Sequence, residues 1–264
     1  DDPFGPRILQ AISVPVLTYS VTGDADLSVA EVQFSVHGIC CRLNSPVGEI
    51  AISSELLGRF NLYNIMAAVG AGLALGIPKE AIRAGIEGHL KVPGRVERVP
   101  NDKGITVLVD YAHTGDALEN VLATISELKT DRIITIFGCG GDRDKGKRPV
   151  MGEIAARYSD LAIVTSDNPR TEDPKEILKD VRAGILPLSL REYTIEELAG
   201  GVREKGFAMI ESRREAVRAA ILTARPGDIV LLAGKGHEDY QIVGTRKLHF
   251  DDREEAAEAL KLRD

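Results

Sequence analysis

The chain has 264 residues, of which 44% are hydrophobic and 28% are charged, and its formal net charge is -7. This length allows one large domain or two ordinary domains, each with its own core. The acidic balance argues against non-specific nucleic-acid binding, which needs a basic face. The cysteines Cys40, Cys41 and Cys139 have neither disulfide nor metal-ligand spacing, so we expect reduced thiols. No run approaches the ~18–20 apolar residues of a membrane span.

The pattern of the first ninety residues changes once, from strand-like to helix-like. Short runs with partial polar–apolar alternation occupy residues 15–21, 30–43 and 48–54, between turn residues, and predict antiparallel strands. Residues 61–76, rich in Ala, Leu and Met, predict a buried helix that ends at Gly76. A second helix is expected over residues 78–90. Residues 91–100 contain two prolines, one glycine and four charges, and predict a boundary between domains 1–92 and 93–264.

Beyond this boundary strand and helix patterns alternate. Continuous apolar runs predict strands over residues 105–111, 132–138, 161–167 and 228–234. Helical patterns lie over residues 117–128, 150–158, 174–183 and 213–224, and a terminal hairpin is expected about Gly244. Strands that are apolar throughout are buried on both faces, as in a parallel sheet flanked by helices. The fold class is therefore α/β, with a Rossmann-like, mostly parallel sheet.

Each of the four predicted strands is followed by an unusual polar loop. These loops read "DYAHTG", "GCGGDRDKGKRP", "SDNPRTEDP" and "GKGHEDY". Ligands of open α/β sheets bind beyond the carboxyl ends of the strands, so the four loops predict one polar site. In the third loop, Asp173 and Pro174 suit a helix start, but a turn does not require Arg170, which could be aimed at a ligand.

The other polar residues leave alternatives open. The glycine-rich second loop is either a solvated connection or a site for an anionic ligand, and it matches no nucleotide fingerprint. Glu238 could hold an ammonium group, and His113 is an acid–base group or a lining residue. His37, His89 and His249 are expected to be structural or at the surface. Asn61 either caps a helix or, with Asn64, grips an adenine edge.

Six motifs in order give this chain a resemblance to a known family. They read "GRFNLYNIMAA", "VPGRVE", "VDYAHTGDALEN", "FGCGGDRDKGKRPVMG", "VTSDNPRTEDP" and "AGKGHEDYQIVG". Together they resemble the Mur ligase family, most closely its MurE type, from about Asp2 to the end. The resemblance implies a cytoplasmic bacterial enzyme, expected to be monomeric. ATP would phosphorylate the D-glutamyl γ-carboxylate of UDP-MurNAc-L-Ala-D-Glu, and an incoming amine would then displace the phosphate.

The resemblance also assigns the loop containing Arg170 a role. In MurE enzymes a DNPR loop reads the incoming amino acid, and its arginine marks users of meso-diaminopimelate. That amino acid differs from lysine by a second carboxylate, for which a guanidinium is a bidentate partner. Lysine would leave a buried arginine unpaired, at a cost on the order of 2–5 kcal/mol.

The resemblance implies the following site residues. Those expected to bind meso-diaminopimelate are Arg143, Asp167, Asn168, Pro169, Arg170, Gly234 and Glu238, with Glu238 taking the ammonium group. Those expected to bind ATP are Asn61 and Asn64 at the adenine, Arg95 at phosphate, Asp110 at ribose, and His113. No catalytic residue or metal ligand is assigned, because the family's phosphate loop, carbamylated lysine and most Mg²⁺ ligands are expected upstream. We therefore expect a piece of a longer ligase, ending a central ATPase domain before a complete C-terminal domain, and inactive in ligation alone.

Two departures from the family pattern affect these assignments. Gly115 stands where proline follows "DYAHT", which leaves the place of His113 less defined, and Ser212 replaces a glycine before Arg213. The alternatives are a non-catalytic module that binds amino acids or acts as a scaffold, a lysine-adding MurE-type ligase, a MurF-type ligase and a folylpolyglutamate synthetase. The DNPR loop argues against the last three.

Overall fold

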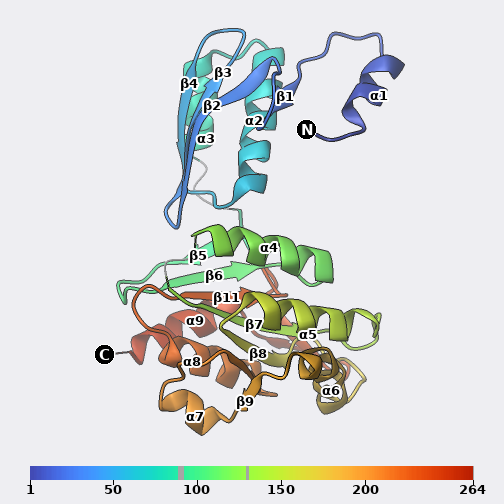
Figure 1. The fold of residues 1–264 in the computed structure, drawn as a ribbon, viewed down its shortest axis with the longest axis vertical. Coiled ribbons are helices and arrows are strands. Elements are labelled where there is room, and N and C mark those ends of the chain that lie inside the picture. The colour runs from blue at the N-terminus through green and yellow to red at the C-terminus, as the bar shows by residue number, and fades with distance from the viewer. Residues whose placement is uncertain (89–91, 129–130, 264) are drawn as a thin grey trace. The chain divides into compact units, whose positions relative to one another are not determined.

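The computed structural model describes residues 1–88, 92–128 and 131–263 (Figure 1). These residues divide into two compact units, Asp1–Val92 and Pro93–Asp264. The end of the expected helix over 78–90, with His89, and the first residue of the expected boundary lie outside the described residues.

The first unit is a four-stranded sheet against which the helices over residues 59–74 and 79–87 pack. Its strand order is β1-β2-β3-β4, and the ladder from β2 to β4 is antiparallel, as predicted. The short β1 pairs with β2 in parallel, so the prediction of an antiparallel first strand was wrong. The elements are α1 (Gly5–Ala11), β1 (Tyr19–Ser20), β2 (Leu27–Ser35), β3 (Gly38–Asn44), β4 (Ile50–Ser54), α2 (Arg59–Ala74) and α3 (Lys79–Glu87).

Buried and exposed residues alternate along the strands of this sheet, and this alternation explains how the sheet packs. Every second residue of β3 and β4 is buried, and the inward side chains meet one face of α2. Their shared core consists of Leu27, Ile39, Cys41, Leu43, Ile50, Ile52, Leu62, Ile65, Met66, Val69 and Ile82. Gly76 follows α2 with a φ of +70°, and its N–H donates to the Leu73 carbonyl, which ends the helix as expected.

The second unit is built on a seven-stranded sheet with the order β5-β6-β11-β7-β8-β10-β9. All neighbours in it are parallel except β5, which runs antiparallel to β6. The strands are β5 (Glu97–Val99), β6 (Thr106–Asp110), β7 (Ile133–Cys139), β8 (Leu161–Ser166), β9 (Arg191–Tyr193), β10 (Gly206–Met209) and β11 (Ile229–Ala233). The predicted α/β class and its four long parallel strands are confirmed.

Helices lie on both faces of this sheet (Figure 1). Neighbouring helices α4, α5 and α6 pack together, as do α7, α8 and α9. These are α4 (Gly115–Leu128), α5 (Lys147–Tyr158), α6 (Pro174–Ile185), α7 (Ile195–Ala199), α8 (Arg213–Thr223) and α9 (Asp252–Lys261), with the 3₁₀ turn η1 (Leu186–Leu188) after α6. The predicted hairpin consists of β12 (Tyr240–Val243) and β13 (Arg246–His249). The strands β6, β7, β8 and β11 are buried at every residue, as expected for a sheet covered on both sides.

Candidate functional site

Four polar loops follow the parallel strands β6, β7, β8 and β11, at the same edge of the sheet. The loops after β7 and β8 are joined directly, because the Gly141 N–H donates to the Asn168 carbonyl at 2.9 Å. Gly141 has no room for a side chain, since an added Cβ would lie 1.9 Å from the Pro169 carbonyl oxygen. The Pro169 carbonyl also accepts from the N–H of Glu172. Close backbone contact therefore fixes one loop against the other.

Arg170 is held by its backbone and by one side of its guanidinium. Its φ is +52°, its N–H donates to the Ile242 carbonyl at 3.0 Å, and its carbonyl accepts from Gly244 at 2.7 Å. Its Nη1 donates to the Gly141 carbonyl at 2.8 Å and to the Asn168 carbonyl at 3.4 Å. Nε and Nη2 have no hydrogen-bond partner among the described residues. These two donors form the edge that a carboxylate can accept from bidentately.

Arg143, the other arginine expected to bind a carboxylate, lies near Arg170. A Cβ added to Gly140 would be 2.9 Å from Nη1 of Arg170 and 3.7 Å from Cγ of Arg143, so both side chains border this glycine. Arg143 is exposed, and its Nη1 donates to the Asp142 carbonyl at 3.1 Å. Two positive side chains thus lie on adjacent loops.

Asn168 links this positive region to Glu238. Its Nδ2 donates to Oε2 of Glu238 at 3.1 Å, and its Oδ1 accepts from the Ile242 N–H at 2.9 Å. Asn168 is buried and Glu238 is half-buried. The negative charge of Glu238 raises the pKa of the neighbouring Tyr240 phenol. The buried amide therefore orients a carboxylate that remains accessible.

Lys235 is a buried charge that the sequence did not single out. Its side chain is 0% exposed, and its Nζ lies 3.2 Å from Oδ1 of Asp167 and 2.7 Å from the Tyr240 carbonyl. Its Nζ also lies 3.4 Å from Oδ1 of Asn168. Asp167, predicted to bind the ligand, is buried, and this ion pair neutralises its carboxylate. A lysine between two glycines after a buried strand was the available signal.

Gly234 and Gly236 shape the loop that carries Lys235. Gly234 has a φ of +113°, and its N–H donates to the Asp110 carbonyl at 3.0 Å. Gly236 has a φ of +54°, and an added Cβ would lie 2.6 Å from Cβ of Tyr111. Glycine accommodates both positive φ values and the close approach.

The residues expected to bind ATP in the second unit lie around Tyr111. Asp110 ends β6, is buried, and accepts from the N–H groups of Val96 and Ala112 at 2.8 Å each. Burial raises the pKa of its carboxyl group, against the lowering effect of these N–H donors. The guanidinium of Arg95 lies 5.0 Å from the centre of the Tyr111 ring. Exposed His113 packs against the same ring at 4.7 Å, and its Nδ1 lies 2.8 Å from the Tyr111 carbonyl.

Asn61 and Asn64 belong to the first unit and lie in α2. The alternative that Asn61 caps this helix was wrong, because Gly58 is the N-cap and Asn61 is already inside the helix. Asn61 Nδ2 donates to the Leu57 carbonyl at 2.8 Å, and its Oδ1 accepts from Asn64 Nδ2 at 3.1 Å. Both amides line a pocket of about 540 Å³ between α2 and α3, which is otherwise mostly apolar.

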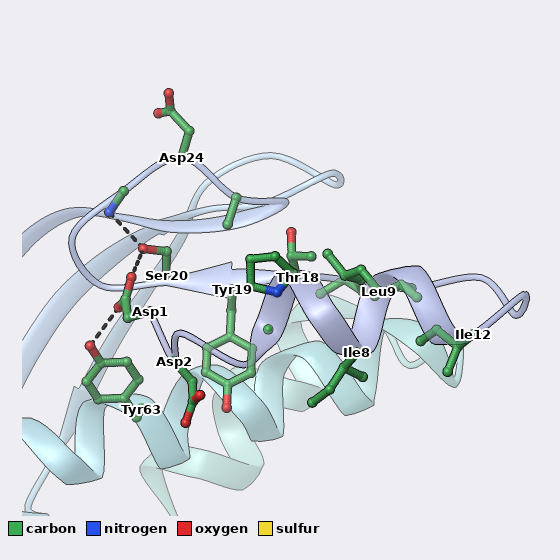
Figure 2. A pocket seen from close by; sticks show the side chains of 16 residues that line it. Asp1, Asp2, Ile8, Leu9, Ile12, Thr18, Tyr19, Ser20, Asp24 and Tyr63 are labelled. Atoms are coloured by element: carbon green, nitrogen blue, oxygen red, sulfur yellow. Dashed lines mark hydrogen bonds between the residues drawn. The ribbon is translucent and has the colours of Figure 1, made fainter.

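A second pocket in the first unit, of about 990 Å³, lies between α1 and β1 (Figure 2). Apolar side chains of Ile8, Leu9 and Ile12 line it, and Asp1 accepts a hydrogen bond from Tyr63 Oη at 2.6 Å. None of the residues predicted to bind ligands lines it.

Several further expectations concern single residues. Asp173 caps α6 by accepting from the Lys175 N–H, with Pro174 at the first helical position, as predicted. His37 and His249 are exposed, and all three cysteines are free. Within residues 1–88, 92–128 and 131–263, no three His, Cys, Asp or Glu side chains are grouped to hold a metal ion. Within the same ranges, no helix is long and apolar enough to cross a bilayer.

The fold and the site define an α/β protein whose loops at the carboxyl edge of a parallel sheet bring cationic, amide and anionic groups close together. Comparison with known families identifies it further. The Mur ligase glutamate ligase domain matches residues 94–236, and the Mur ligase middle domain matches residues 1–72. The chain belongs to the Mur ligase family.

Several relatives of this chain share the same protein name. Proteins of Geobacter metallireducens and Geobacter sulfurreducens are 63% and 60% identical over 99% and 100% of this chain. Both are called UDP-N-acetylmuramoyl-L-alanyl-D-glutamate--2,6-diaminopimelate ligase, and the chain covers 51% and 52% of their lengths. A solved structure of a ligase with this name is 38% identical, with a TM-score of 0.67 over 93% of this chain and 47% of that chain. The chain therefore spans about half the length of these relatives.

Proposed function

We propose that this chain forms the amino-acid-selecting part of a ligase that adds meso-diaminopimelate to UDP-MurNAc-L-Ala-D-Glu. In the proposed reaction, the γ-phosphoryl group of ATP passes to the D-glutamyl γ-carboxylate, giving an acyl phosphate and ADP. The amine nitrogen of meso-diaminopimelate then attacks the acyl carbon, phosphate leaves, the nitrogen loses a proton, and an amide forms. The names of the relatives support the two substrates, the resemblance to the Mur ligase family supports the acyl-phosphate chemistry, and the site supports the choice of amino acid.

The observation that carries the proposal is the free edge of the Arg170 guanidinium. Two backbone carbonyls occupy Nη1, so the guanidinium cannot rotate freely, and Nε and Nη2 remain as a preoriented pair of donors. Lysine has no second carboxylate to accept from them. An amino acid that has one gains a charge-assisted, bidentate contact, to which Arg143 adds a second positive charge.

The negative charge of Glu238 suits the ammonium group of an amino-acid ligand. In the proposal, Glu238 accepts from an ammonium group, and Asn168 keeps the Glu238 carboxylate turned toward the ligand. Gly234 and Pro169 shape the surrounding backbone, and Asp167 acts through Lys235. The ammonium group of the ligand then meets the carboxylate of Glu238, and the additional carboxylate of the ligand meets the guanidinium groups of Arg170 and Arg143.

ATP is assigned to the residues around Tyr111 and to the amides of α2. Asp110 has carboxylate oxygens suited to ribose hydroxyls, Arg95 is suited to a phosphate, and His113 lines the same region. Asn61 and Asn64 would read the adenine edge. The described residues offer no grouped ligands for Mg²⁺, so no step is assigned to a metal ion held by them.

Calorimetric titration of the chain with meso-diaminopimelate and with L-lysine tests the proposal. Arg170→Asn is the informative variant, because asparagine tolerates the left-handed backbone at this position. Arg182→Ala is the matched control, since this exposed arginine of α6 pairs with Glu192. We expect meso-diaminopimelate to bind at least about tenfold more tightly than lysine, and Arg170→Asn alone to remove the difference. Equal binding of both amino acids by the unaltered chain, or no binding of either, would refute the proposal.

A further inference from the structure

Two charged side chains, Arg148 and Glu172, form an ion pair beneath the loops that carry Arg143 and Arg170. Arg148 is the second residue of α5, and its side chain is 0% exposed. Its Nη1 donates to Oε2 of Glu172 at 3.1 Å and its Nη2 to Oε1 at 2.9 Å. This bidentate contact fixes the Glu172 carboxylate in the plane of the guanidinium.

Through this pair each loop holds the backbone of the other. Oε1 of Glu172 accepts from the Asp142 N–H at 2.6 Å, while Arg148 Nη2 donates to the Gly140 carbonyl at 3.3 Å. In return, the Asp142 carboxylate accepts from Oγ1 of Thr171 at 2.8 Å and from its N–H at 3.2 Å. A carboxylate from each loop therefore binds main-chain donors of the opposite loop.

The residues held in this way are sequence neighbours of the two ligand-facing arginines. Asp142 precedes Arg143, and Thr171 follows Arg170. Asp142 and Arg170 have φ values of +55° and +52°, a backbone region that residues other than glycine adopt only when their surroundings hold them there. Release of either loop would let this backbone relax and would move the guanidinium next to it.

We propose that Arg148 and Glu172 are positioning residues that set the selectivity of this site for an amino acid with a second carboxylate. The inference rests on the proposed function, since it concerns the same ligand. Arg148 is sealed from solvent, so it acts through the loops and makes no ligand contact of its own. Its removal should weaken the contact to the second carboxylate and leave the contacts that lysine can also make.

Selectivity is therefore the quantity to measure. Dissociation constants for meso-diaminopimelate and L-lysine would be obtained by calorimetry, with competition titration for the weaker ligand, on the 264-residue chain. Glu172→Gln removes the charge of the pair, and Thr171→Val removes one exposed hydrogen bond with little effect on folding. Asp228→Asn is the control, because its buried pair with Arg132 (2.6 Å) lies before β7 and β11, at the opposite edge of the sheet.

In Glu172→Gln we expect meso-diaminopimelate to bind about tenfold more weakly and lysine to bind as before, since one charge-assisted contact corresponds to roughly that factor. Thr171→Val should show a smaller change in the same direction, and Asp228→Asn should keep the ratio of the two constants. If the unaltered chain prefers meso-diaminopimelate and both loop variants keep that preference, the positioning role is wrong while the proposed function stands. If the unaltered chain binds neither ligand, both are refuted.

Discussion

The fully buried ion pair between Arg213 and Asp252 allows a sharp test of how the second unit is stabilised. Arg213 Nε donates to Oδ1 of Asp252 at 2.8 Å and its Nη2 to Oδ2 at 2.6 Å, with both side chains 0% exposed. Nη2 also donates to the carbonyl of Ala233, the last residue of β11, at 3.0 Å. The pair thus joins α8, α9 and β11.

Removing one partner should lower the stability of the second unit far more than removing both. Asp252→Leu leaves the buried guanidinium without its hydrogen-bonded counter-charge, which costs about 3–5 kcal/mol. Arg213→Met leaves the buried Asp252 carboxylate unpaired, with a cost of the same order. The double variant buries no charge, and its remaining cost is about 1–2 kcal/mol because the Ala233 carbonyl loses a donor.

Thermal and urea unfolding would measure these costs. The chain has no tryptophan, so far-ultraviolet circular dichroism is the suitable signal. For a unit of this size a loss of 3–5 kcal/mol lowers Tm by about 10 °C. Arg214→Met is the matched control, because the exposed Arg214 joins the same two helices by pairing with the half-buried Glu255, and its loss should cost less than about 1 kcal/mol.

The double variant shows whether Arg213 and Asp252 stabilise the unit as a coupled pair or independently. If it loses as much stability as the two single variants together, the pair is not coupled and the reasoning from buried charge is wrong. A cost below about 1 kcal/mol for Asp252→Leu would refute it equally, because the unpaired guanidinium would then have found another partner.

Three further predictions concern the loops. Lys235→Met should destabilise the second unit by about 3–5 kcal/mol in urea unfolding, since the buried Asp167 carboxylate loses the partner of its ion pair. The double variant Lys235→Met/Asp167→Leu should recover part of the lost stability, and equal stability of Lys235→Met and the unaltered chain would contradict the prediction. Arg148 lowers the pKa of Glu172 from 4.5 to about 2, so this contribution to stability is complete above about pH 5 and is lost as the pH falls toward about 2. Urea unfolding over that range should show a shallower loss in Glu172→Gln, and parallel curves would refute this assignment. Gly141→Ala should abolish binding of meso-diaminopimelate in calorimetry, because the new Cβ would lie 1.9 Å from a backbone oxygen, and unchanged affinity would show that the loops adjust.

The sequence predicted the parts of the fold that have a strong local pattern. β6, β7, β8 and β11 are continuous apolar runs, and α6 begins with an aspartate and a proline, so each could be identified alone. β5, β9 and β10 have three or four residues and no such run. The helix α9 was missed because it is dominated by charged residues, with a narrow apolar face formed by Ala256, Ala259 and Leu260.

The supporting residues of the site were harder to predict than the residues proposed to face the ligand. Arg170 stands in a polar loop where a turn does not require it, Arg143 stands in a glycine-rich polar loop, and the roles of both remain predictions. Arg148 is one of several positive residues in its segment, and its burial depends on where α5 begins and on a carboxylate that comes from another loop. Lys235 becomes buried only when the hairpin and the loop after β8 close over it, which is a non-local contact.

The place of β11 in the sheet has a consequence for how the second unit is made. Ile229 pairs with both Thr106 and Ile133, so the last strand of this sheet along the chain separates two strands synthesised much earlier. On the ribosome, β6 and β7 must wait without their shared neighbour until Ile229–Ala233 has emerged. Such long-range pairing slows folding and leaves strand edges exposed during synthesis. The emergence of β11, rather than early growth from the β6 end, should therefore be the event that commits this unit to its native state.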